Sequence, residues 1–286
     1  MGRAGDNVKS EPRWKEEYSE RQVEAARRVL VDIGQILASF KDCIVLVGGW
    51  IPDLLIPESE EPHVGSIDVD FALDAAKLNS KRYAELLNLL LDTRRYRRGE
   101  KDFQLVVDVD LGDGEPAVQV QVEFMAPTGV NMKKHKPRLV PGFRVLQTDG
   151  CGVAFNAPVE KEIKGKDVLG AENTVRMEVV SMSDFLVMKS LAIGGRDKPK
   201  DSYDLCYCLD HSPNGFSSVA ADWKSRLKDS NVSKAVSILE EKFSTVDSFG
   251  PSRVVEFHNS SAPEERDRQA RRAFELVSRF LELIEL

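Results

Sequence analysis

Residues 67–73, reading IDVDFAL, alternate between apolar and acidic or small side chains, the pattern of a β-strand that buries one face. Successive side chains along a strand point to opposite faces, so Val69 and Phe71 should face the core. Asp68 and Asp70 then share the other face. The pattern therefore predicts two carboxylates held on a rigid strand that faces a cleft.

A second constraint lies upstream, where the apolar run at 43–47 ends at Gly48 and Gly49. Such a run closed by a glycine pair is typical of a buried strand followed by a tight turn. The sequence IPDLL after the turn predicts a short helix. Glycines at a strand-to-helix turn let backbone amides approach a phosphate chain, because no side chain blocks the way. We therefore expect Gly48 and Gly49 to hold a triphosphate.

Periodicity assigns most of the remaining elements. Apolar residues at three- and four-residue steps predict an amphipathic helix at 19–40 that packs on the sheet. Two strands, at 103–110 and 117–124, flank the turn LGDGEP and predict a hairpin. Between about 126 and 180 the pattern is less regular, with strand-like pieces such as VRMEVVS. Further helices are predicted at 81–92, 184–191, 201–210, 232–243 and 263–286.

The order of these elements, strands first and helices later, predicts an α+β architecture. The chain has 286 residues, enough for one large domain or two modest ones. We expect a polar leader at 1–18 and a domain with a mixed β-sheet flanked by helices at 19–180. A helical C-terminal domain should follow at 181–286.

Composition narrows the class of protein. No apolar run is long enough to span a membrane and the N-terminal residues lack a signal-peptide stretch, so we expect a cytoplasmic protein without membrane contact. Four scattered cysteines predict reduced, structural thiols. The net charge of -7 argues against a broadly basic surface, so any contact with nucleic acid should be local.

Two carboxylates on one strand face can bind a pair of divalent ions, Mg²⁺ or Mn²⁺. Such ions bridge a nucleoside triphosphate and stabilise both the entering and the leaving oxygen. Together with the glycine turn, the acidic pair points to nucleotidyl transfer, in which an acceptor hydroxyl attacks the α-phosphate and pyrophosphate leaves. An Asp-x-Asp strand or a glycine pair also occurs by chance, so their order carries more weight than either motif alone.

In that order, VLVGGWIPDLL followed by GSIDVDFAL resembles the nucleotidyltransferase superfamily, whose mixed-sheet fold places a glycine turn before an Asp-x-Asp strand. Downstream, MKSLAIGGRDKPKDSYDL is similar to the AbiEii/AbiGii-type nucleotidyltransferase toxins. The resemblance covers roughly residues 20–210. The interval from Gly49 to Asp68 is longer than usual in the superfamily. Trp50 stands where a serine is common, and we expect it to pack rather than to stack on a base.

The resemblance implies a metal site. It assigns Asp68 and Asp70 to the binding of two metal ions, and Glu123 to the third carboxylate, which helps to activate the acceptor hydroxyl. Glutamate departs here from the more usual aspartate. Asp108 and Asp110 compete for this role, because they share one face of the neighbouring strand. We prefer Glu123, which ends a polar strand face.

In the downstream motif the resemblance places Lys189 and Arg196 against the triphosphate, where fixed cations assist transfer, and counts Lys189 among the catalytic residues. Asp201 and Asp204 belong to the same nucleotide-binding block and either orient the two cations or contact the acceptor or the base. The residues alone leave plainer alternatives open. Lys189 could be a solvated helix position, and Asp204 a helix-surface partner of Lys200 four residues earlier.

The function that joins these features is transfer of a nucleoside monophosphate from ATP, GTP or CTP to a hydroxyl. The family likeness makes RNA, particularly a tRNA 3′ end, or a protein hydroxyl the expected acceptor, and an antitoxin the expected partner. Two rivals are a small-molecule nucleotidyltransferase of the antibiotic-modifying kind and a catalytically silent nucleotide- or protein-binding module of the same fold. Basic runs at 94–98 and 133–136 are either RNA contacts or solvated loops.

Overall fold

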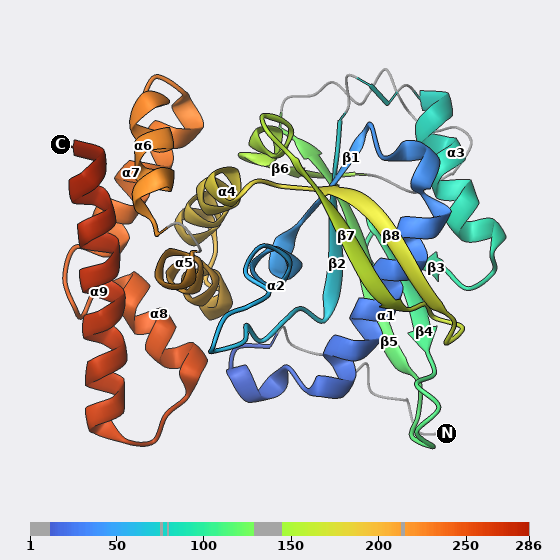
Figure 1. Cartoon of the computed structure of the whole chain (residues 1–286), viewed down its shortest axis with the longest axis horizontal. Helices are drawn as coiled ribbons and strands as arrows, with labels where there is room; N and C mark the ends of the chain where they lie inside the picture. The colour runs from blue at the N-terminus through green and yellow to red at the C-terminus, as the bar shows by residue number, and fades with distance from the viewer. Residues whose placement is uncertain (1–11, 75–76, 79, 129–144, 213–214, 286) are drawn as a thin grey trace, which may run out of the picture.

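A mixed β-sheet organises the chain (Figure 1). The computed structural model describes residues 12–74, 77–78, 80–128, 145–212 and 215–285. Its strands follow the spatial order β3-β4-β5-β2-β1-β8-β7, with β6 paired to β5. They are β1 (Ile44–Val47), β2 (Asp68–Leu73), β3 (Arg97–Arg98), β4 (Gln104–Val109), β5 (Val118–Pro127), β6 (Leu146–Thr148), β7 (Val159–Lys166) and β8 (Glu172–Val179).

The helices lie in two groups in Figure 1, to the right and to the left of the central strands β1 and β2. The right-hand group is α1 (Glu20–Ile36) and α3 (Ser80–Asp92). The left-hand group is α4 (Met182–Gly195), α5 (Pro199–His211), α6 (Ser217–Ser225), α7 (Ser230–Lys242), α8 (Phe249–His258) and α9 (Pro263–Glu285). The short α2 (Ile51–Leu55) follows a 3-10 turn, η3 (Gly48–Trp50), after β1. The helices α4 and α5 lie nearest the sheet, and α9 lies at the far left.

Helix α1 forms where the sequence predicts it because both its start and its face are encoded locally. Ser19 accepts a hydrogen bond from the Gln22 backbone N–H, and the Gln22 side chain reaches back to Ser19, a capping box that satisfies otherwise unpaired amides. Val29 and Ile33 on its apolar face are fully buried. The helix packs along β4, β5, β7 and β8 and so covers one face of the sheet.

The predicted α+β architecture is confirmed: a mixed sheet flanked by helices precedes a helical C-terminal region. The strands at 103–110 and 117–124 form the antiparallel hairpin β4–β5. All four cysteines are buried free thiols. The boundary near residue 180 stays a prediction.

The less regular pattern between 126 and 180 contains a second hairpin, β7–β8, which the sequence analysis did not predict. The segment VRMEVVS falls largely in β8. Strand β7 reads VEKEIKGK and ends the strand order of the sheet, where most of its side chains are exposed and no apolar alternation is required. Helices α6 and α8 are also not visible in the sequence pattern. No helix in the described ranges has the length and apolar character needed to cross a membrane.

Candidate active site

Three carboxylates meet on the central strands. Strands β2 and β5 pair in parallel, with Asp70 opposite Glu123 and Asp68 opposite Gln121. Because the register is parallel and residue-for-residue, all four side chains lie on the same face of the sheet. The intervening Val69 has no exposed surface and faces the core, as the alternation predicts.

The competing carboxylates lie elsewhere. Asp108 on β4 is opposite Gln119, is half exposed, and forms an ion pair with Arg97 at 2.7 Å. Asp110, just after β4, accepts a hydrogen bond from the Gly112 backbone N–H. The structure thus places Glu123 next to Asp70. Neither Asp108 nor Asp110 is in that position. The role of Glu123 as a third metal ligand stays a prediction.

The two aspartates of β2 are in unequal electrostatic environments. Burial, followed by the negative charges of Asp68 and Glu123, raises the pKa of Asp70 well above its ordinary value. Burial also acts to raise the pKa of Asp68, but the ammonium of Lys198 and a hydrogen bond from Ser66 Oγ to Asp68 Oδ1, 2.5 Å long, outweigh it and lower that pKa. Asp70 in particular lies next to other negative charges, and a cation bound beside it would reduce this repulsion.

The glycine turn touches this acidic site directly. Gly48 has a φ of +78°, a left-handed conformation that side chains disfavour, and a Cβ at this position would collide with the Asp70 carboxylate. A Cβ at Gly49 would lie 2.5 Å from Ser66 Oγ and 3.0 Å from Lys200 Nζ. Both positions therefore need glycine because other groups come close to the backbone. Gly48 lies against the Asp70 carboxylate, and Gly49 lies against the Ser66 hydroxyl and the Lys200 ammonium.

We expect Gly48→Ala to destabilise the protein by about 1–3 kcal/mol and to displace Asp70, because it adds backbone strain and a collision together. The matched control is Gly112→Ala, in the β4–β5 loop. Gly112 has a φ of +74°, and a Cβ added there would meet no atom within 4 Å, so this variant carries the strain alone. Chemical denaturation of both variants measures the difference; equal losses would contradict a contact between the turn and Asp70.

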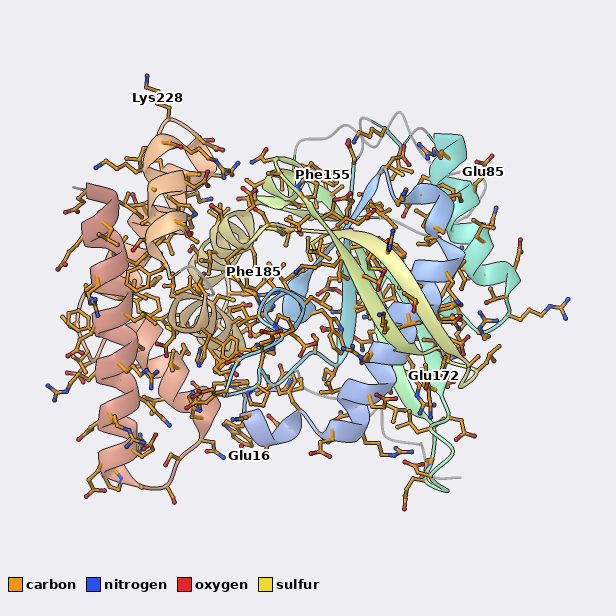
Figure 2. The ribbon with its side chains drawn as sticks, viewed as in Figure 1. Glu16, Glu85, Phe155, Glu172, Phe185 and Lys228 are labelled. Atoms are coloured by element: carbon orange, nitrogen blue, oxygen red, sulfur yellow. The ribbon has the colours of Figure 1, made fainter. Side chains whose placement is uncertain are left out.

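A buried ion-pair cluster on α4 and α5 adjoins the turn. Lys189 Nζ lies 2.8 Å from Asp201 Oδ1 and 2.7 Å from Asp204 Oδ2. Arg196 donates to the same Asp201 carboxylate through Nε at 2.7 Å and Nη2 at 3.0 Å. The Lys189 ammonium also lies 5.5 Å from the centre of the Phe185 ring, which Figure 2 labels on α4. Asp201 thus pairs with both cations and Asp204 with Lys189; that they orient these cations for a nucleotide stays a prediction.

Burial decides how these charges behave. Both aspartates have no exposed surface, so the interpretation of Asp204 as a helix-surface charge was wrong, although its pairing with Lys200 at 2.8 Å is present. Burial acts to raise the pKa of Asp201, but Lys189 and Arg196 lower it to about 2. Burial likewise acts to lower the pKa of Lys189, and the two aspartates raise it above its ordinary value. A solvated position for Lys189 is excluded; its direct contact with a phosphate stays a prediction.

His63, which the sequence did not single out, completes the cluster. Its Nδ1 lies 3.1 Å from the Gly65 backbone N–H and accepts from it, so the ring proton is on Nε2, which donates to Asp204 Oδ1 at 2.9 Å. The ring stacks on Tyr203, with centroids 5.3 Å apart. Burial and then the charge of Lys200 lower the pKa of His63 to about 4. The histidine is therefore a neutral donor.

This histidine should make stability depend on pH. Its pKa of about 4 in the folded chain is below the ordinary 6.5, so the unfolded chain binds more protons between these values. The resulting contribution is present above pH 6.5 and decreases by about 3 kcal/mol as the pH falls to 4. His63→Gln keeps a donor to Asp204 but does not titrate. Unfolding free energies measured across this range should fall less steeply in the variant; parallel curves would contradict the assignment.

Lysines in the segment DKPKD supply positive charge next to the carboxylates. Lys198 lowers the pKa of both Asp68 and Asp70, and Lys200 is 3% exposed with its ammonium beside Gly49. Burial, opposed by Asp204, lowers the pKa of Lys200. Lys189, Arg196, Lys198 and Lys200 therefore lie among the carboxylates of Asp201, Asp204, Asp68 and Asp70, while His63 is neutral. The sequence signal for the two additional lysines is their position between Arg196 and Asp201. Lys198 and Lys200 thus place positive charge beside the acidic strand and the glycine turn.

No three His, Cys, Asp or Glu side chains of the described chain are arranged as a ready metal-binding group. Two of the three carboxylates already have partners within the protein. Ser66 occupies Asp68 Oδ1, while Glu123 Oε1 accepts from Gln104 Nε2 at 2.8 Å and lies 3.6 Å from Lys101 Nζ. Ser66 and Gln104 are further residues that the sequence analysis missed. Metal binding would require the carboxylates to exchange these partners for an ion.

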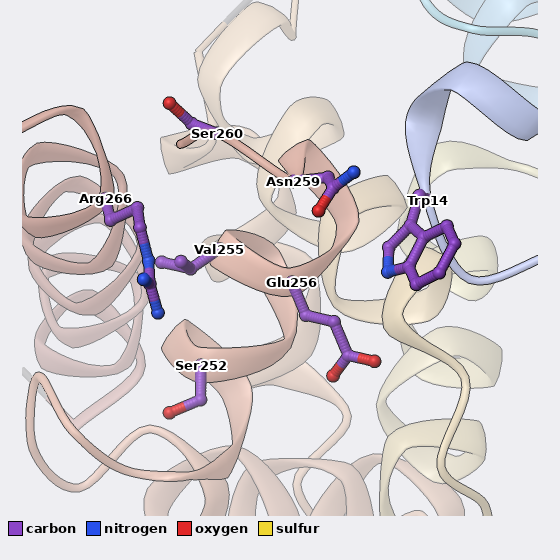
Figure 3. Close-up of a pocket in the computed structure, with 7 residues that line it drawn as sticks. All are labelled: Trp14, Ser252, Val255, Glu256, Asn259, Ser260 and Arg266. Atoms are coloured by element: carbon purple, nitrogen blue, oxygen red, sulfur yellow. The ribbon is translucent and has the colours of Figure 1, made fainter. Parts of the chain in front are cut away.

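Arg13, in the N-terminal segment, contacts the loop that contains Arg196 and Lys198. Arg13 donates to the Asp197 carbonyl oxygen at 3.2 Å and to Glu256 Oε1 at 2.7 Å. Figure 3 shows Glu256 on α8 lining a hollow of about 390 Å³ together with Trp14 of this segment. The hollow is lined by none of the predicted site residues. Arg13 and Arg253, which both pair with Glu256 and with Asp197, link it to the loop of the site.

The structure also shows the surroundings of Trp50 and of the basic run at 94–98. Trp50 is 1% exposed and donates through Nε1 to the Asp68 carbonyl oxygen at 2.9 Å, so it packs and holds the acidic strand. In the basic run at 94–98, Arg95 pairs with buried Asp32 at 3.0 Å and Arg97 pairs with Asp108. These two arginines are engaged within the protein. The run at 133–136 lies outside the described residues.

No protein-family model matches the sequence, and no curated protein matches it. Among solved structures, the fold is similar to an antigenic nucleotidyltransferase-like protein from Paracoccidioides brasiliensis. The two chains are 16% identical, the match covers 76% of this chain and 88% of the other, and the TM-score is 0.43. The likeness is distant.

Proposed function

We propose that the protein is a metal-dependent nucleotidyltransferase that transfers a nucleoside monophosphate from a nucleoside triphosphate to a hydroxyl. The observation that carries the proposal is the residue-for-residue pairing of Asp70 with Glu123, beside Asp68 and against the glycine turn. Three carboxylates on one sheet face next to a cation-rich turn combine a place for divalent ions with a place for a polyphosphate.

The chemistry of the carboxylates fits a divalent cation. Asp70 is half-buried between the negative charges of Asp68 and Glu123, and oxygen ligands are those that Mg²⁺ and Mn²⁺ prefer. Asp68 and Asp70 would hold the ions, with Glu123 as the third ligand. When bound, such ions neutralise phosphate charge and align the entering and leaving oxygens.

The glycine turn and the adjoining cations support triphosphate binding. Gly48 lies against the Asp70 carboxylate, so a phosphate chain held by the turn would also be close to the acidic site, and the ammonium of Lys200 lies beside Gly49. Lys198 and Arg196 add positive charge near the carboxylates. We assign Lys189 to positioning, because its ammonium is engaged by Asp201 and Asp204.

In the proposed reaction the acceptor oxygen forms a bond to the α-phosphorus, and the bond from that phosphorus to pyrophosphate breaks. The hydroxyl proton passes to Glu123, whose carboxylate is 17% exposed. Fixed cations at the turn stabilise the charge that accumulates on the leaving pyrophosphate. The chain's own contribution is thus orientation, charge stabilisation and one proton transfer.

The finer AbiEii-like assignment rests on the Lys189, Arg196, Asp201 and Asp204 motif. Its implications, a tRNA 3′ end or a protein as acceptor and an antitoxin as partner, stay predictions from that motif. The identity of the nucleotide, ATP, GTP or CTP, stays open in the same way.

The test is transfer of label from each α-labelled nucleoside triphosphate, with Mg²⁺ or Mn²⁺, into RNA, protein and small-molecule pools. We expect labelled product and released pyrophosphate with the wild-type protein. Binding of the triphosphate with the metal but no product in any pool would indicate the silent nucleotide-binding module. Absence of binding would refute the proposed function.

A further inference from the structure

The sheet face that carries the carboxylates continues outward over β5, β4 and β3. Alternation and register place Gln119 and Gln121 on this face in β5, and Gln104 and Asp108 beside them in β4. Arg97 of β3 lies opposite Val106 on the same face. We call this set the amide face: Arg97, Gln104, Asp108, Gln119 and Gln121.

The amide face is open to solvent at Arg97, Asp108, Gln119 and Gln121, whereas Gln104 is buried and the opposite face is covered. Gln119 and Gln121 are exposed. Val120 and Val122, which alternate with them along β5, have no exposed surface, and α1 packs against β4 and β5. Gln121 is two residues from Glu123, about 7 Å along the strand, so a molecule on this face could reach the carboxylates.

The direction of nucleotidyl transfer selects this face for the acceptor. Entering and leaving oxygens lie roughly in line at the phosphorus that is transferred. The glycine turn and Lys200 lie at the β1 end of the site, and in the sheet order β1 and β5 are on opposite sides of β2. If pyrophosphate leaves toward the turn, the acceptor hydroxyl enters from the β5 side.

The chemistry of the amide face favours neutral hydroxyl groups. Gln104 Nε2 donates to Gln121 Oε1 at 3.0 Å, and Gln119 Nε2 donates to Asp108 Oδ1 at 3.2 Å. Within the described chain this leaves the Gln121 NH₂ and the Gln119 carbonyl oxygen without a hydrogen-bond partner. An amide donor next to an amide acceptor matches a hydroxyl, which both donates and accepts.

Charge argues against a polyanion on this face. Arg97 pairs with Asp108 at 2.7 Å, and Lys101, at the end of the face, lies 3.6 Å from Glu123. Tight RNA binding draws on cations that are available to neutralise phosphates, and each of these two already has a carboxylate partner. We propose that the amide face binds the acceptor and that the acceptor is an uncharged, polyhydroxylated small molecule. This inference rests on the proposed nucleotidyl transfer.

The first experiment compares acceptor pools. An extract of the source cells is separated into a neutral low-molecular-mass fraction, total RNA and protein, and a defined set of inositols and disaccharides is added as a fourth pool. Each is incubated with the protein, Mg²⁺ and α-labelled nucleoside triphosphate. We expect label in the neutral fraction. Label confined to RNA or protein, or no label in either neutral pool although the triphosphate binds with Mg²⁺, overturns the inference. Failure to bind the triphosphate instead overturns the proposed function.

The second experiment uses Gln119→Leu and Gln121→Leu, with Thr174→Leu at an exposed position of β8 as the matched control. Neither glutamine variant removes the bond from Gln104 to Glu123. Each should raise the KM for the labelled acceptor about tenfold, while kcat and the affinity for the Mg²⁺-bound triphosphate stay close to wild type. A merely structural role would reduce triphosphate affinity or stability as well. An unchanged acceptor KM in both variants contradicts the inference.

Discussion

Replacing Asp70 with asparagine is expected to reduce nucleotidyl transfer by about 10³-fold or more, because the change removes the negative charge that would hold a divalent ion against the α-phosphate. The side chain keeps its size, so the shape of the site is preserved. Steady-state transfer of label, with the best nucleoside triphosphate and acceptor, measures the loss. Transfer within about tenfold of wild type would rule out Asp70 as a metal ligand in the reaction.

The same substitution should not destabilise the metal-free protein. Burial and the neighbouring charges of Asp68 and Glu123 disfavour a third negative charge at this position, as the raised pKa of Asp70 shows. We therefore expect the unfolding free energy of Asp70→Asn, without metal, to equal or exceed that of wild type. Mg²⁺ or Mn²⁺ should stabilise the wild-type protein and have less effect on the variant. A large loss of stability without metal would show that the carboxylate serves the fold rather than the reaction.

Replacing Asp204 with asparagine is expected to destabilise the protein by about 3–5 kcal/mol, since it leaves buried charge without a counter-charge. Asp204 contacts Lys189 Nζ at 2.7 Å, Lys200 Nζ at 2.8 Å and His63 Nε2 at 2.9 Å, and it has no exposed surface. Lys189 retains Asp201, but the ammonium of Lys200 loses its paired carboxylate. Chemical denaturation at neutral pH measures the effect.

Two further variants separate charge from packing. Lys200→Met combined with Asp204→Asn removes the stranded ammonium, so the double variant should lose less stability than the sum of the two single changes. Glu162→Gln removes the carboxylate of an exposed ion pair with Arg176 and should leave the unfolding free energy near that of wild type. An Asp204→Asn variant as stable as Glu162→Gln would show that the cluster contributes little to the fold.

Much of the fold follows from local patterns. Alternation in IDVDFAL is sufficient to place β2, and Ser19 with its capping box is sufficient to begin α1. Strand β7 is different, because Ile163 is its one buried side chain and a single buried position imposes no apolar alternation on VEKEIKGK. Its pairing with β8 is decided by backbone hydrogen bonds, which leave no signature in side-chain type.

In the candidate site, too, some features follow from local sequence and others depend on the folded chain. Contacts between near neighbours in the chain place Asp68 and Asp70 on one strand face and a glycine turn after an apolar strand, so both could be predicted from the residues alone. The folded structure, in contrast, decided that Glu123 is the carboxylate beside Asp70, since that depends on the parallel register of β2 and β5. It also decided that His63 meets Asp204 across 141 residues and that Asp204 is buried. Pairing between distant segments and burial depend on how the whole chain packs, and burial changes an ordinary surface charge into one that requires a partner.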